Sequence, residues 1–417
     1  MDRSIRQSLG ACVVLTLLAP QTAPAQTAIQ CPGDLDGDAI PDPVLDDNQP
    51  NPAYRPEVKC MHLSAGDGYI TMADGRQLYM FGFSDLTGIP QDEAMMEGVL
   101  AAAFPAPTIS VDEGDELYLT LTNVGMPDRP DLFDPHTVHW HGFPNAAPIF
   151  DGVPDAAISI NMGASLTYFY KVVHPGTYMY HCHVEATEHM QMGMLGNLYV
   201  NPAQDKLAAG TVLPNGFVHQ SGFTYAYNDQ DGSTRYDVHA AIQLGSFDPD
   251  FHDASENVQP LPFANMLDRY AMLNGRGYPD TVNPGALAPP EGNGGKPSQV
   301  ETSRVAAVVG QRILLRFSNL NVTQFYTLGT VGLPMRVVGH NARLLRGPSP
   351  GGVTPGHDLS YVTNSITLGG GEALDAMIDT SSLAPGTYFL YAKNLNYLNN
   401  NTEDYGGMMT EIVITAP

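Results

Sequence analysis

One short segment of the sequence combines three side chains that bind soft transition metals. Residues 181–194 read HCHVEATEHMQMGM and place a thiol, an imidazole and a thioether in one stretch, at Cys182, His189 and Met194. A thiolate, two imidazoles and a weak axial thioether form a blue-copper site, because this mixed set accepts both oxidation states of copper with little rearrangement. Zinc also binds cysteine and histidine, but it has no use for the methionine. The segment therefore predicts copper and one-electron chemistry.

A second segment supplies further imidazoles. Residues 136–142 read HTVHWHG, and His136 is the candidate for the missing imidazole of the blue-copper set. Alternate residues of a strand face the same side, so His139 and His141 are expected to point together. The spacing predicts a pair of metal ligands beside the first site.

The same alternation applies to the HCH triplet. His181 and His183 share one side of the chain, and Cys182 between them faces the opposite side. A covalent path of a few atoms would then join the Cys182 thiolate to histidines that face a different site. This arrangement suits electron transfer between two metal centres.

The elements that must position these residues are strands. Glycine and proline are abundant, at 42 and 34 residues, and short alternating apolar runs such as ELYLTL at 116–121 are bounded by turn residues. This pattern is typical of antiparallel β-sandwiches. An internal repeat, in which residues 113–123 recur as 309–319, predicts two consecutive sandwiches in an all-β chain.

The repeat also sets the expected domain boundaries. We expect the first sandwich at residues 57–202 and the second at 210–417, after an acidic segment at 26–56. Residues 1–25 combine early arginines, an apolar run and a small-residue cleavage motif, which predicts a signal peptide and a periplasmic or secreted product. No later apolar run approaches the roughly 18 to 20 residues of a membrane span.

Cysteine count and net charge narrow the environment and the partners. Three cysteines follow the predicted signal, and the simplest pairing joins Cys31 to Cys60 and leaves Cys182 free for a metal. The formal net charge of −25 disfavours nucleic acid and anionic membranes as partners. A basic redox protein or a cationic substrate fits this charge, and solubility alone explains it as well.

The acidic segment contains a candidate calcium loop. Its carboxylates stand at Asp34, Asp36, Asp38 and Asp42, and the Ile40 carbonyl would be a further donor. Hard oxygen ligands at such spacing can surround calcium, and the stretch resembles the aspartate loops of thrombospondin type 3 repeats. A merely solvated acidic linker explains the same residues. Both readings stay open.

The HWHG of residues 139–142 and the HCH…H…GM of residues 181–194 together resemble the copper motifs of multicopper oxidases, particularly their small two-domain, laccase-like branch. The resemblance implies two cupredoxin-like Greek-key sandwiches, a fold shared with copper nitrite reductases. It implies a type 1 copper and half of a trinuclear, oxygen-reducing cluster, and it suggests a homotrimer. The implied type 1 ligands are His136, Cys182, His189 and Met194, and the implied half-site is His139, His141, His181 and His183.

The second repeat departs from that family pattern. Its counterpart of residues 136–141 reads YTLGTV at 326–331, and its counterpart of His181–His183 reads YAK at 391–393. Each ligand position is replaced, and a cation at Lys393 would repel a copper ion. We therefore expect a complete type 1 site beside a half-site, to be completed by water or by another subunit.

Two functions fit this sequence. The first is an exported copper oxidoreductase of multicopper oxidase type, which takes electrons from a small reductant or a redox protein and passes them to an incomplete oxygen-reducing cluster. The second is a blue-copper electron carrier or copper-binding protein without oxidase activity. The complete first-repeat motifs favour the oxidoreductase, and the replaced ligands of the second repeat favour the carrier.

Overall fold

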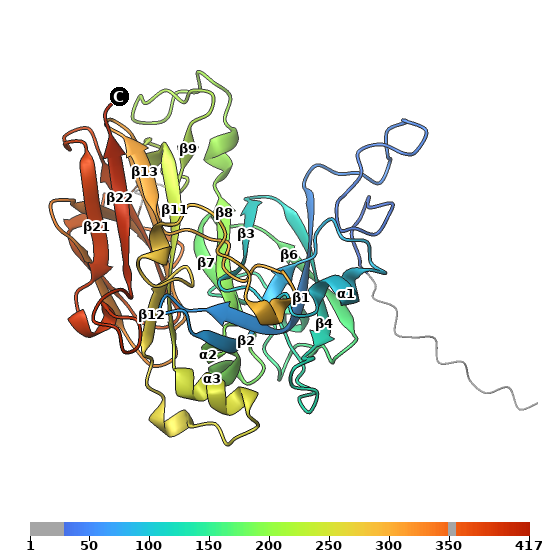
Figure 1. Cartoon of the computed structure of the whole chain (residues 1–417). Helices are drawn as coiled ribbons and strands as arrows, with labels where there is room; N and C mark the ends of the chain where they lie inside the picture. The colour runs from blue at the N-terminus through green and yellow to red at the C-terminus, as the bar shows by residue number, and fades with distance from the viewer. Residues whose placement is uncertain (1–28, 349–355) are drawn as a thin grey trace, which may run out of the picture.

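The computed structural model describes residues 29–348 and 356–417, so the predicted signal peptide at 1–25 lies outside the described residues. Strands dominate, and they gather into two sandwiches that lie against each other, as Figure 1 shows. Within the described part of the chain, no helix is long and apolar enough to span a membrane. The prediction of an all-β chain with two Greek-key sandwiches is confirmed.

The first sandwich is built from two four-stranded sheets. One sheet has the order β2 (Gln77–Asp85), β1 (Val58–Thr71), β4 (Glu116–Gly125) and β6 (Ser165–Lys171). The other has the order β3 (Ala106–Asp112), β8 (Leu195–Asn201), β7 (Gly176–His181) and β5 (His139–His141). Alternate leucines of β4, at 117, 119 and 121, are buried between the two sheets. This alternation is the pattern that the sequence predicted.

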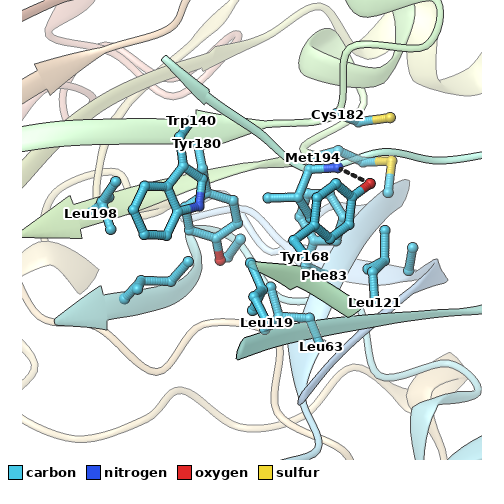
Figure 2. Close-up of a cluster of buried hydrophobic side chains, with 14 of the residues drawn as sticks. Leu63, Phe83, Leu119, Leu121, Trp140, Tyr168, Tyr180, Cys182, Met194 and Leu198 are labelled. Carbon is cyan, nitrogen blue, oxygen red and sulfur yellow. Dashed lines mark hydrogen bonds between the residues drawn. The ribbon is translucent and has the colours of Figure 1, made fainter. Parts of the chain in front are cut away.

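The core of the first sandwich contains large aromatic side chains next to the predicted ligands. Trp140 stacks on Tyr170 with ring centroids 3.8 Å apart. Figure 2 shows the sulfur atoms of Cys182 and Met194 at the edge of this core, on the side of Tyr168. The Tyr168 hydroxyl accepts a hydrogen bond from the Val138 amide at 3.1 Å, which fixes the backbone between two predicted ligands.

The second sandwich repeats the plan with larger sheets. One sheet has the order β12 (Tyr270–Leu273), β11 (Val238–Phe247), β14 (Arg312–Asn319), β20 (Glu372–Asp379), β16 (Met335–His340) and β17 (Arg343–Leu344), and β18 (Tyr361–Thr363) pairs with β16. The other has the order β13 (Val305–Val308), β22 (Met409–Thr415), β21 (Gly386–Ala392), β15 (Tyr326–Thr330) and β19 (Ser365–Leu368). A small ribbon of β9 (Thr224–Tyr225) and β10 (Arg235–Tyr236) follows the first sandwich. The exact domain boundaries stay a prediction.

Helices are short and lie in the connections. The α-helices are α1 (Ala94–Gly98), α2 (Ala186–Gln191) and α3 (Pro249–Glu256). The 3-10 turns are η1 (Pro148–Phe150), η2 (Ala203–Lys206), η3 (Phe263–Asn265), η4 (Asp280–Val282), η5 (Glu291–Asn293) and η7 (Leu395–Tyr397). Of these elements α2 matters most for the site, because it joins β7 to β8 within the segment that carries the predicted ligands.

A cluster of buried, mostly polar side chains joins the two sandwiches. Arg316 of β14 donates to Thr177 Oγ1 of β7 at 3.3 Å, and its guanidinium lies 4.9 Å from the ring centroid of Tyr199 on β8. Asp375 of β20 accepts hydrogen bonds from Thr177 and from the Tyr227 hydroxyl. We call these five residues the interface cluster. They hold the strands of the predicted copper sites against the second sandwich.

Asp67 of β1 makes stability depend on pH. Its side chain is fully buried, and it accepts hydrogen bonds from Tyr79 and from the Asp128 amide. Burial raises the pKa of Asp67 to about 6, and the two hydrogen bonds only partly oppose this. A raised acid pKa contributes stability at low pH that is lost as the pH rises through the folded-state pKa.

Replacement of Asp67 by asparagine removes this titration. We expect the free energy of unfolding of the wild-type protein, relative to Asp67→Asn, to fall by about 2 kcal/mol between roughly pH 4.5 and pH 7. Urea denaturation at several pH values measures the difference. The exposed Asp92→Asn is the control for the substitution itself and should change the free energy of unfolding by less than about 0.5 kcal/mol. A pH-independent difference for Asp67→Asn would contradict the assignment.

Candidate copper sites

The first candidate site brings a thiol and two imidazoles together in the core of the first sandwich. Cys182 directly follows β7, His136 precedes β5, and His189 lies in α2. The Nδ1 atoms of His189 and His136 lie 3.1 and 3.8 Å from Cys182 Sγ. All three side chains are fully buried, and one ligand atom from each lies within 4.8 Å of the others. With Met194 we call this group the thiolate site.

Backbone hydrogen bonds shape the loop around the thiolate site. The Cys182 amide donates to the Met194 carbonyl at 3.1 Å, and the Met194 amide donates to the His189 carbonyl at 2.8 Å. The Thr137 amide points at Cys182 Sγ from 3.5 Å, which stabilises negative charge on sulfur. Met194, the thioether that the sequence predicted for a blue-copper site, is also fully buried and lies at the same edge of the core as Cys182 in Figure 2.

The electrostatics of the thiolate site favour a bound cation. Burial disfavours charge on His189, but the Cys182 thiolate and the Asp134 carboxylate outweigh burial and raise the pKa of His189 to about 10. Burial, together with the neighbouring His189, lowers the pKa of His136 well below its usual range. One neutral imidazole, one proton-binding imidazole and the Cys182 sulfur are thus buried side by side. A copper ion could take the place of the proton, so these residues fit copper.

Asp134 is a residue of this site that the sequence reasoning missed. One carboxylate oxygen lies 3.9 Å from His189 Nε2, and the Asp134 side chain is 20% exposed whereas that of His189 is fully buried. Asp134 therefore connects the buried histidine to solvent. Its sequence signal is weak, because an aspartate two residues before a ligand looks like any loop carboxylate.

The second candidate site consists of three histidines on two paired strands. His139 of β5 lies opposite His181 of β7, and His141 Nδ1 lies 3.4 Å from His181 Nε2. His139, His141 and His181 each offer a ring nitrogen within 4.8 Å of the others. We call these three residues the histidine site. His183 lies beside this group, with its ring centroid 5.0 Å from that of His139, but it is not part of the set of ring nitrogens that lie within 4.8 Å of one another.

Hydrogen bonds orient two of these rings. His139 Nδ1 lies 2.5 Å from the Asp151 carbonyl, and His181 Nδ1 lies 2.8 Å from the Cys182 carbonyl. Each carbonyl accepts a proton from Nδ1, which leaves Nε2 free as a metal ligand, as is usual for metal-binding histidines. Burial lowers the pKa of His139 and of His141, and it lowers the pKa of His181 to about 3. The imidazoles are therefore neutral at neutral pH.

The opposite wall of the histidine site comes from the second sandwich of the same chain. A cavity of about 550 Å³ lies between the histidines of the first sandwich and residues 320–325 and 370–371. A β-carbon on Gly371 would lie 2.8 Å from His141 Nε2, so the backbone approaches this ring closely. The lining that the structure describes includes no histidine from the second sandwich. No sequence signal pointed to these wall residues.

In the second sandwich, the positions that correspond to the histidines of the first repeat pair in the same strand register. Gly329 of β15 lies opposite Tyr391 of β21, just as His139 lies opposite His181. A β-carbon on Gly329 would meet the Lys393 side chain at 2.8 Å, so the lysine stem covers the position that a ligand would use. The second repeat thus keeps the strand pairing and lacks the imidazoles.

The acidic loop is only partly assembled as a cation site. Carboxylates of Asp34, Asp36 and Asp42 lie within 4.8 Å of one another, whereas Asp38 is not part of that group. The Asp34 carboxylate already accepts hydrogen bonds from three backbone amides of the loop. Cys31 and Cys60 form a disulfide that fastens the loop to β1, with Cα atoms 5.8 Å apart. Calcium binding stays a prediction.

Family models identify both halves of the chain. A multicopper oxidase model matches residues 90–205, and a second multicopper oxidase model matches residues 253–414. The chain belongs to the multicopper oxidase family. The first match contains every residue of the thiolate site and of the histidine site, and the second covers most of the second sandwich.

Individual relatives are similar in sequence to a smaller part of the chain. The chain is 34% identical to multicopper oxidase MCE of Talaromyces pinophilus over 31% of its own length and 19% of that protein. It is 34% identical to an L-ascorbate oxidase of Cucurbita pepo var. melopepo over 25% of its own length and 18% of that protein. A blue copper oxidase from Nitrosomonas europaea has a similar fold, with a TM-score of 0.60, 21% identity and 86% of each chain covered.

The residues of this chain fit one part of the copper set that the family resemblance implies and do not fit the other part. The thiolate site offers the sulfur and nitrogen donors of a type 1 copper, buried and convergent. A trinuclear cluster would need imidazoles on both walls of the cavity, and among the described residues only the first sandwich supplies them. The residues present do not fit a trinuclear cluster.

Proposed function

We propose that this chain is an exported copper oxidoreductase that takes single electrons from a donor at the thiolate site and delivers them to the histidine site. The main support for this proposal is that two consecutive residues belong to the two sites. Cys182 Sγ lies next to two imidazole nitrogens of the thiolate site, and His181 belongs to the histidine site. A copper ion at the thiolate site would supply reversible one-electron oxidation and reduction. The Cys31–Cys60 disulfide supports a periplasmic or secreted location.

The residues of the chain have distinct tasks in this function. Cys182 and His181 are consecutive, so the path between the two sites is covalent and short. The buried aromatic core keeps water from the thiolate site, which limits rearrangement of solvent when its charge changes. Asp134 links His189 to the surface and therefore marks the side from which a donor approaches. A small reductant is favoured, and the negative charge of the chain favours a cationic one.

Oxygen uptake with a reducing donor tests the function. Copper-loaded protein mixed with a phenolic donor is expected to consume oxygen while the donor is oxidised. Asp134→Asn should slow reduction by a cationic donor about 5-fold, because one unit charge nearby is worth about 1 kcal/mol in water-exposed surroundings. Reduction by an anionic donor is the internal control and should not slow. Reduction of copper without any oxygen uptake would instead support an electron carrier.

A further inference from the structure

The histidine site has the dimensions of a single-ion site. Two metal–nitrogen bonds of about 2.0 Å place the two nitrogens at most about 4 Å apart. The 3.4 Å between His141 Nδ1 and His181 Nε2 fits one ion bound to both atoms, and His139 offers a ring nitrogen within 4.8 Å of both. His183, the fourth histidine of the expected half-site, lies outside this group.

The facing wall offers no replacement ligands for a larger cluster. Its polar side chains are already engaged: Thr323 donates to Asp268, Gln324 accepts from the Tyr397 hydroxyl, and Asn321 donates to two neighbouring oxygens. The backbone at Gly371 occupies the space directly in front of His141. The second sandwich therefore closes one side of the histidine site without contributing imidazoles to it.

We infer that the histidine site binds one copper ion through His139, His141 and His181, and that each chain holds two coppers instead of the four of a complete multicopper oxidase. The cavity in front of the histidines leaves room for a small molecule as an additional ligand. Two coppers store two electrons, whereas reduction of dioxygen to water requires four. The inference goes beyond the proposed function, which needs only an acceptor next to the thiolate site.

Copper counting on the loaded full-length protein tests this inference without measuring activity. We expect two coppers per chain by elemental analysis, both visible by electron paramagnetic resonance, one with a type 1 spectrum and one with an ordinary cupric spectrum. The paired substitution His139→Ala/His141→Ala should leave one copper and the type 1 spectrum. Four coppers per chain with a spin-silent pair would overturn the inference, including the case in which a neighbouring subunit supplies imidazoles. A single copper in the unsubstituted protein would overturn it as well.

Gly371→Ala tests the role of the facing wall. The new β-carbon would press on His141, so the second copper should be lost while the type 1 spectrum remains. Gly310→Ala is the matched control, because Gly310 has a similar positive φ of 97° against 88° for Gly371 but has open space around it. The control should keep both coppers. If the unsubstituted protein showed no type 1 spectrum, the proposed function would be refuted. A wrong number of coppers beside a normal type 1 spectrum would refute only the inference about the histidine site.

Discussion

Cys182→Ser is expected to abolish the intense blue absorption of the copper-loaded protein. That absorption arises from charge transfer between a thiolate and copper, and Cys182 is the free cysteine of the described chain. A hydroxyl is a harder and weaker donor, so the two imidazoles of the thiolate site would at best retain a pale copper. Visible absorption spectroscopy before and after copper loading measures the loss.

Met192→Leu provides the control for this experiment. Met192 is a fully buried methionine in the same loop as Met194, and the structure places it in the hydrophobic core. Leucine conserves its volume, so the blue absorption should persist. If Cys182→Ser kept the blue absorption, the thiolate site would be assigned to the wrong residues. If Met192→Leu alone lost the blue absorption, the absorption would depend on the packing of the loop and not on the Cys182 ligand.

Arg316→Met is expected to destabilise the protein by about 3–5 kcal/mol, the cost of leaving the buried Asp375 charge without a compensating positive charge nearby. Arg316 is buried and lies opposite Asp375 on the neighbouring strand. Burial opposes its charge, but Asp375, together with Tyr236 and Tyr199, outweighs burial and raises the pKa of Arg316 above its usual range. Without the arginine, the Asp375 carboxylate would keep only its neutral hydrogen-bond donors, Thr177 and Tyr227.

A second substitution separates lost charge from lost packing. Arg316→Met combined with Asp375→Asn removes the uncompensated charge and should recover at least about 2 kcal/mol of the free energy of unfolding. The exposed Arg304→Met is the control and should change stability by less than about 0.5 kcal/mol. Urea denaturation followed by fluorescence measures all three variants. If the double variant were no more stable than Arg316→Met, electrostatic pairing would not be the source of the effect.

Much of the fold could be predicted from the sequence because its signals are local. Alternating apolar residues and frequent turn residues define short strands, and a recurring segment shows that one sandwich follows another. The boundaries of the strands, the small ribbon of β9 and β10 and the order of the strands in each sheet needed the structure. These features depend on which strands pair, and strand pairing joins residues that are distant in the sequence.

The candidate sites divide in the same way. By itself the sequence determined the donor types at Cys182, His189 and Met194, the strand alternation that turns His181 away from its neighbour Cys182, and the absence of imidazoles at the matching positions of the second repeat. Ligand chemistry and strand alternation are properties of neighbouring residues, so a single segment reveals them. The register of Gly329 opposite Tyr391 agrees with that comparison of the two repeats.

Only the tertiary structure decided which of these side chains lie close together. It placed His183 outside the histidine site, Asp134 beside His189, and the backbone at Gly371 against His141. Each of these relations crosses between separate segments, and the last crosses between the two sandwiches. Their distances follow from how the sandwiches pack, through buried hydrogen bonds such as those of Arg316 and Asp375 with Thr177, and no local pattern in the sequence encodes that packing.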